Sequence, residues 1–132
     1  MPKVMFVLRS YRMKVVYCIK RNPAMSVEQF RDYWLDEHGA LVKRVANVIQ
    51  AQKYVQSHTI APEINDFLRK SRGMGQPYDG ITEMWWESRE QFEASTRQPG
   101  AQQAIQELIE DEKNFIDFSN SSFFITEEYP IF

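Results

Sequence analysis

The apolar positions between Ser26 and Ile49 recur at steps of three and four residues, a pattern that predicts a long amphipathic helix. The residues that share its apolar face are Val27, Phe30, Trp34, His38, Leu41, Val45 and Val48. His38 therefore occupies a place where the pattern predicts core or the wall of a pocket. Ser26 and Gln29 have the spacing of a capping box, which satisfies free backbone N–H groups where a helix begins.

Four shorter segments alternate between two faces, which is typical of strands, and they cover residues 13–20, 53–59, 78–87 and 122–128. A short helix is predicted from Phe92 to near Pro99. A longer one is predicted from Ala101, with Ile105, Leu108, Ile109, Glu112, Phe115 and Ile116 on its inward side. The connection over 60–77, with a short helical piece around 64–70, is long enough to predict a lid or rim.

The order of these elements is strand, helix, two strands, helix, strand. It predicts an α+β fold of the ferredoxin-like βαββαβ type, with an antiparallel four-stranded sheet and helices on one face. The other sheet face also carries large apolar residues, and a homodimer with two sheets packed back to back would cover it. The length of 132 residues fits one domain over 13–132. Residues 1–12 are interpreted as an extra strand, an arm on a neighbouring subunit, or read-through from a start codon that belongs at Met13.

The composition argues against several classes of partner, cofactor and reaction. A net charge of −2 argues against nucleic acid and anionic membranes as partners, and no stretch approaches the length of a membrane span. Cys18 is the single cysteine, so no intrachain disulfide is expected and a cytoplasmic location is predicted. Phosphate-binding glycine loops and the GxSxG elbow are absent, so we expect no nucleotide cofactor, no phosphoryl transfer and no hydrolase of that type. The aromatic share of 14% indicates an aromatic core or a large apolar cavity.

Three ionisable residues on otherwise apolar faces are the candidate catalytic groups: His38, Glu83 and Glu112. A partly buried histidine titrates near neutral pH, and a buried carboxyl group would be held protonated, so one cavity could contain both a base and an acid. The alternative for His38 is a packing residue with satisfied hydrogen bonds, and for each glutamate an ion pair with Lys or Arg. The predicted substrate-binding walls are Phe30, Trp34, Tyr54, His58, Trp85 and Phe115. The histidine spacing preorganises no metal site, so neither metal nor haem is expected.

Three segments, in this order, resemble the EthD domain family of the dimeric α+β barrel superfamily, named for ethyl tert-butyl ether degradation. They are MKVVYCIKRNPAMSVEQFRDYWLDEHGALVKR, YDGITEMWWES and DEKNFIDFSNSSFFITEE. Gly39 stands where the family more often has alanine. The resemblance implies the fold, a homodimer, and a pocket between the sheet and the helices of each subunit.

The family's chemistry is diverse, so the resemblance leaves the reaction open. Together with the three ionisable groups, it favours a cofactor-independent acid/base enzyme of the dehydratase, isomerase or cyclase type. The expected substrate is an apolar oxygenated ring or polyketide-like compound. One alternative is a cofactor-free oxygenase or an accessory protein of a monooxygenase pathway. Another is a non-enzymatic binding protein for a small apolar molecule.

Overall fold

The structure, a computed structural model, describes residues 13–132, so the arm or extra strand predicted for residues 1–12 lies outside the described residues. The strands are β1 (Met13–Ile19), β2 (Lys53–His58), β3 (Gly80–Trp86) and β4 (Ser122–Glu127). The helices are α2 (Val27–Asp32), α3 (Gly39–Ile49), α4 (Pro62–Arg72), α5 (Arg89–Thr96) and α6 (Ala101–Glu112). A π-helical turn, η1 (Tyr33–His38), joins α2 to α3, and a short 3₁₀ turn, η2 (Phe118–Asn120), precedes β4.

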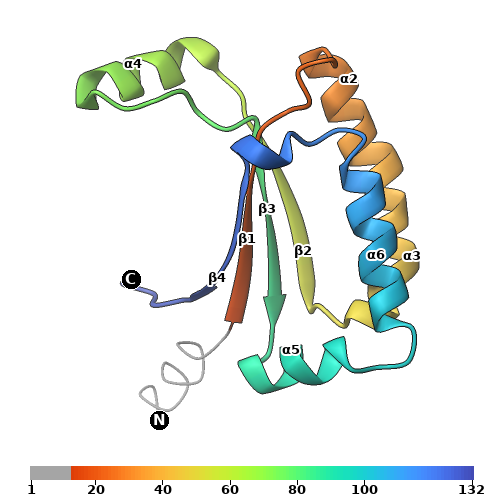
Figure 1. The fold of residues 1–132 in the computed structure, drawn as a ribbon. Coiled ribbons are helices and arrows are strands. Elements are labelled where there is room, and N and C mark those ends of the chain that lie inside the picture. Colours follow the sequence, from red (N-terminus) through yellow and green to blue (C-terminus); the bar gives the residue numbers. More distant parts are fainter. Residues whose placement is uncertain (1–12) are drawn as a thin grey trace.

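The sheet has the strand order β2-β3-β1-β4, and every neighbouring pair is antiparallel. This topology confirms the predicted ferredoxin-like α+β fold. Figure 1 shows that α2, α3 and α6 form a layer on one side of the sheet and that α5 lies at the end of the sheet where β3 finishes. Helix α4 projects from the opposite end, away from that layer.

Alternation along β1 decides which side chains meet the helical layer. Met13, Val15, Tyr17 and Ile19 are buried, whereas the residues between them are only partly covered. The core continues from β1 into the helical layer through Phe30, Trp34 and Phe115, all at most 1% exposed. Gly80 on β3 makes room for this core, because an added Cβ would lie 2.5 Å from the Trp34 ring.

The helix predicted over Ser26–Ile49 is continuous but contains the π-helical turn, which the sequence pattern did not predict. The capping box between Ser26 and Gln29 forms as expected. In η1 the backbone N–H of Gly39 bonds to the Trp34 carbonyl, five residues back, and Gln56 Nε2 donates to the same carbonyl at 2.8 Å. Such turns insert one extra residue into a helix and are frequent at functional sites. Here the turn ends at His38.

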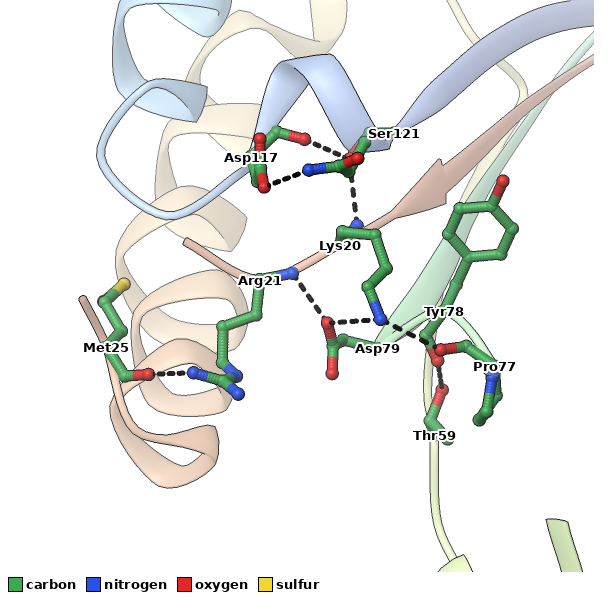
Figure 2. A network of polar contacts seen from close by, with 10 residues as sticks. Lys20, Arg21, Met25, Thr59, Pro77, Tyr78, Asp79, Asp117 and Ser121 are labelled. Atoms are coloured by element: carbon green, nitrogen blue, oxygen red, sulfur yellow. Dashed lines mark hydrogen bonds and ion pairs between the residues drawn. The ribbon is translucent and has the colours of Figure 1, made fainter. Parts of the chain in front are cut away.

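A polar network fastens the end of the sheet that carries α4 (Figure 2). Asp79 accepts the backbone N–H of Arg21 at 2.7 Å and lies 3.8 Å from the ammonium of Lys20. Thr59, which begins the connection to α4, bonds through its hydroxyl to the Tyr78 carbonyl at 2.7 Å and through its backbone N–H to the Asp79 carbonyl. Both ends of the 60–77 segment are therefore held at the same place.

The 60–77 segment carries a longer helix than the piece predicted around 64–70, and no residue of α4 is buried. Its Ile64 and Phe67 are 56% and 70% exposed. The segment is no lid over the His38 region. Because it is anchored at the far end of the sheet, it forms the rim of a separate cleft of about 340 Å³ with residues of α2.

Candidate functional site

Two neighbouring cavities lie between the helix-covered sheet face and the helical layer. The inner cavity, of about 30 Å³, is lined by His38, Trp34, Tyr17, Tyr54, Thr82, Glu112 and Phe115, among others. The outer cavity, of about 390 Å³, has a mostly apolar lining that includes Val15, Trp86, Phe92, Ile105, Ile109 and Ile125. Both cavities share Ile49, Met84, Leu108, Glu112 and Phe123 in their linings. Glu112 is therefore the ionisable group at their junction.

His38 forms a dyad with Asp111 of α6. Nδ1 of His38 lies 2.8 Å from Oδ2 of Asp111, and the histidine is only 5% exposed. The other carboxylate oxygen of Asp111 accepts the Tyr33 hydroxyl at 2.5 Å, and Asn114 Nδ2 donates to that hydroxyl at 3.0 Å. A carboxylate at Nδ1 fixes the histidine tautomer and leaves Nε2 as the basic ring nitrogen.

Burial and hydrogen bonding act in opposite directions on this dyad. Burial lowers the pKa of His38 and outweighs the bond to Asp111, which raises it. For Asp111, burial raises the pKa, but the bonds from Tyr33 and His38 outweigh it and hold the pKa below its usual range. At neutral pH the pair is therefore a neutral imidazole that donates its Nδ1–H to a carboxylate, and His38 is able to accept a proton.

The pKa of Glu112 is raised, whereas that of the neighbouring Asp111 is lowered. Burial is the main cause that raises its pKa to about 7, and the charge of Asp111 adds to the shift. The Tyr17 hydroxyl, 3.1 Å from Oε1 of Glu112, partly opposes it by donating a hydrogen bond. A carboxyl group with this pKa is about half protonated at neutral pH and can supply a proton there.

Three polar side chains of β2, Tyr54, Gln56 and His58, are joined by hydrogen bonds through the Gln56 amide. Gln56 Nε2 donates to the Tyr54 hydroxyl at 3.0 Å, and Gln56 Oε1 accepts from Nε2 of His58 at 2.9 Å. The His58 ring stacks on Trp34 with centroids 4.2 Å apart and planes 19° apart. These contacts fix His58 and the indole against the sheet.

Among the predicted site residues, the structure brings His38, Glu112, Trp34, Tyr54 and Phe115 together around the inner cavity. His58 joins this group through the Trp34 stack. Phe30 lies behind Trp34, with ring centroids 5.4 Å apart, and lines the separate cleft next to α4. Their chemical roles stay predictions.

Glu83 and Trp85 do not join this cavity, so the expected meeting of Glu83 with His38 is wrong. Strand alternation in β3 turns Thr82, Met84 and Trp86 toward the helices and the residues between them to the other sheet face. There Glu83 pairs with Lys14 at 2.8 Å, the ion-pair alternative considered for it. The Lys14 and Lys53 ammonium groups lie 5.5 and 5.0 Å from the Trp85 ring.

Sequence reasoning missed Asp111, Tyr17, Gln56 and Tyr33 as polar partners. Tyr33 lies beside Phe115, with ring centroids 5.4 Å apart, and reaches Asp111 from the π-helical turn. One signal was present for Asp111, because it directly precedes the candidate Glu112.

Within residues 13–132, no cluster of three or more His, Cys, Asp or Glu side chains is arranged to bind a metal ion. No helix in this part of the chain has the length and apolar character needed to cross a membrane.

The family model described as the EthD domain matches residues 22–119. No curated protein matches the sequence.

Solved structures share the fold at low sequence identity. An EthD-like protein from Ralstonia eutropha is 17% identical, with a TM-score of 0.58 over 89% of this chain and 92% of that one. The hydroxynitrile lyase from Passiflora edulis is 12% identical, with a TM-score of 0.60 over 93% and 98%. A Bacteroides fragilis protein of unknown function, described as dimeric and ferredoxin-like, is 9% identical, with a TM-score of 0.54 over 89% and 96%. At these identities the likeness concerns the fold alone.

Proposed function

The chain belongs to the EthD domain family, and we propose that it is a cofactor-independent acid/base enzyme acting on an apolar, oxygenated ring compound. The observation that carries the proposal is that His38 and Glu112 line one cavity with complementary protonation states. His38 is a neutral base there, and Glu112, with a pKa of about 7, is an available acid. Two titratable groups with environments that separate their protonation states are the usual arrangement for acid/base catalysis.

The outer cavity supports the substrate class. Its volume of about 390 Å³ is in the range of small-molecule sites, and its lining is mostly apolar. Two polar side chains of that lining, Ser95 and Thr96, already donate their hydroxyls to the Phe92 and Glu93 carbonyls. An uncharged ring compound fits such a lining, with its reacting carbon directed toward Glu112 and His38.

The proposed chemistry begins with proton removal from a carbon next to a carbonyl group. His38 Nε2 takes that proton, and the electron pair moves into the carbonyl as an enolate forms. Protonated Glu112 then donates its proton to a departing β-hydroxyl, which leaves as water, or to another carbon of the conjugated system. The first outcome is dehydration and the second is isomerisation. A solved neighbour with this fold is named as a hydroxynitrile lyase, which supports lyase chemistry by analogy.

Two probes separate these steps. Exchange of the α-protons of 2-tetralone in D₂O, followed by NMR, reports carbon deprotonation, and dehydration of 4-hydroxy-4-phenylbutan-2-one, followed by enone absorbance, requires the acid as well. His38→Gln should lower both rates by roughly 10² or more. Glu112→Gln should lower dehydration and spare most of the exchange. Glu110→Gln is the matched control, because Glu110 is on the same helix and 58% exposed.

The proposal is wrong if the wild-type protein accelerates neither reaction over buffer across a panel of such ketones, or if His38→Gln retains full exchange. Oxygen uptake with a phenol or quinol, without added cofactor, would instead support the oxygenase alternative.

We also propose that the protein is a cytoplasmic homodimer whose subunits pack their open sheet faces together. The solved neighbour described as dimeric supports this assembly. On that face Phe124 of β4 is 46% exposed, and it pairs across the sheet with Val16. Covering such apolar side chains would stabilise a dimer.

A further inference from the structure

The indole N–H of Trp34 is a buried donor that lacks a hydrogen-bond partner among residues 13–132. Trp34 is 0% exposed, and its ring lines the inner cavity. Buried polar groups in folded proteins are nearly always paired, so an orphaned donor beside a cavity requires an explanation. An acceptor that enters the cavity from outside would satisfy it.

A second donor lies beside the indole. The Tyr54 hydroxyl already accepts a hydrogen bond from Gln56 Nε2 at 3.0 Å, which leaves its own proton for donation. Burial raises the pKa of Tyr54, and Gln56, Thr82 and the Trp34 indole oppose that rise as hydrogen-bonding groups near its oxygen. The indole N–H faces that oxygen without the geometry of a hydrogen bond to it, so it stays open to a better-placed acceptor. Two N–H or O–H donors, Trp34 and Tyr54, therefore lie close together in the wall of one cavity.

The Gln56 amide, which donates to the Tyr54 hydroxyl, is itself held in one orientation. Gln56 Nε2 also donates to the Trp34 carbonyl at 2.8 Å, and Gln56 Oε1 accepts from His58 at 2.9 Å. Rotating the amide by half a turn would break the bond to the Trp34 carbonyl and set two oxygens against each other. The nitrogen is therefore held toward Tyr54, so that this hydroxyl acts toward the cavity as a donor.

The size of the inner cavity limits what it can hold. Its volume of about 30 Å³ is enough for one oxygen-sized group and too little for a ring. The outer cavity is more than ten times larger, at about 390 Å³, and shares Glu112 and Met84 with it. A ligand could therefore place an apolar body in the outer cavity and a single oxygen atom in the inner one.

We propose that the inner cavity is an oxyanion site, in which Trp34 Nε1–H and the Tyr54 hydroxyl donate hydrogen bonds to one carbonyl oxygen of the substrate. The inference rests on the proposed function and deepens it, because it names an uncharged ketone as the substrate class. When a proton leaves the adjacent carbon, negative charge collects on that oxygen. Donors already in place stabilise this charge without reorganisation.

The test is a binding experiment that needs no turnover. The probes are 2-tetralone and tetralin, which share a ring system and differ by the carbonyl group. The chain has three tryptophans, so a ¹⁵N spectrum contains three side-chain indole signals, and Trp85→Phe and Trp86→Phe identify that of Trp34 by elimination. We expect 2-tetralone to move the Trp34 N–H signal downfield and slow its exchange with solvent, and tetralin to leave it in place.

Tyr54→Phe supplies the second readout, because it removes one donor and keeps the ring. It should weaken 2-tetralone binding about tenfold and leave tetralin binding unchanged. Tyr78→Phe is the matched control, since Tyr78 precedes β3 and lines the separate cleft next to α4. The inference is overturned if neither probe moves the Trp34 signal, or if Tyr54→Phe weakens both probes equally.

This outcome is independent of the proposed chemistry. Ketone-selective binding without α-proton exchange would uphold the oxyanion site and contradict the enzyme. Exchange without ketone-selective binding would uphold the enzyme and contradict the oxyanion site.

Discussion

Asp111 lies 73 positions after His38 in the sequence, and its Oδ2 stands 2.8 Å from the histidine Nδ1. The contact joins the π-helical turn to the last turn of α6, so the packing of two helices sets the orientation of the imidazole. Tyr33, five residues before His38, holds the other oxygen of the same carboxylate. The candidate base is therefore oriented by residues that the sequence places far apart.

Asp111→Asn should impair the dyad without emptying the space that it occupies. The bond to Asp111 raises the pKa of His38, so its loss should lower that pKa further. An amide can also present its N–H to Nδ1 and favour the wrong tautomer, which should reduce α-proton exchange by roughly 10–10³-fold. NMR titration of the two histidines checks the pKa, with His58 as the internal reference. An unchanged His38 titration would contradict the role of Asp111.

Glu112 should make the protein less stable as pH rises. Its pKa is about 7 in the folded protein against a reference of 4.5, so between these values the folded state binds the extra proton. The free energy of unfolding from this group is then highest below pH 4.5 and falls as pH rises to about 7. The change is on the order of 3 kcal/mol, from the size of the shift.

Glu112→Gln should remove that slope, because the amide does not titrate. Urea unfolding at pH 5 and pH 8 measures the difference, and the variant should equal or exceed the wild-type stability at pH 8. Glu110→Gln, at an exposed site on the same helix, should keep the wild-type slope. The lowered pKa values of His38 and His58 act in the opposite direction in both proteins, so the difference between wild type and variant isolates Glu112. The same pH dependence in the wild type and in Glu112→Gln would contradict the raised pKa.

The sequence predicted the order of the elements and the face of the first helix, because apolar periodicity is a local property. Trp34 and His38 were placed correctly for this reason, whereas Phe115, predicted on the inward face of the last helix, follows the end of α6 at Glu112. Both faces of β3 carry apolar and polar residues, so alternation alone could not decide which face meets the helices. Glu83 and Trp85 were assigned to the pocket, whereas Thr82 and Met84 line it.

The partners of the site residues were harder to predict, because they depend on contacts between elements. Asp111 and Glu112 are adjacent on α6 and reach His38 and Tyr17, on a helix and a strand respectively. A regular helix turns Tyr33 about 100° from Trp34. Tyr33 begins the π-helical turn, and a single turn of this kind leaves no apolar periodicity in the sequence that would predict it.

Tyr17→Phe should shift the pH dependence of dehydration. The Tyr17 hydroxyl donates to Glu112 and lowers its pKa, so without it the pKa should rise above about 7. Glu112 would then stay protonated to higher pH, and the descending limb of the kcat/KM profile should shift to higher pH. The phenyl ring keeps the edge contact with Phe123, whose centroid lies 4.7 Å away. A limb that stays in place or moves to lower pH would show that this hydrogen bond does not tune Glu112.

Phe124→Asp should weaken the proposed homodimer, because it places a charge on the open sheet face. Light scattering after size-exclusion chromatography should show a monomer, or a dimer that dissociates at higher concentration than the wild type. Leu35→Asp is the control, since Leu35 is 59% exposed on the helical layer. A wild-type monomer, or equal effects of the two substitutions, would contradict pairing through this face.

Gly80→Ala should destabilise the fold at the site of closest packing. The added Cβ would lie 2.5 and 2.6 Å from two atoms of the Trp34 ring and 2.8 Å from the Ser57 carbonyl oxygen. The indole is fully buried and the carbonyl belongs to a paired strand, so neither can move freely. Overpacking of this kind costs about 1–3 kcal/mol. Gly75→Ala meets no atom within 4 Å and is the matched control in urea unfolding. Because the indole would have to tilt, Gly80→Ala should also shift the Trp34 N–H signal. Equal stability of Gly80→Ala and Gly75→Ala would show that this core is packed less tightly than its geometry implies.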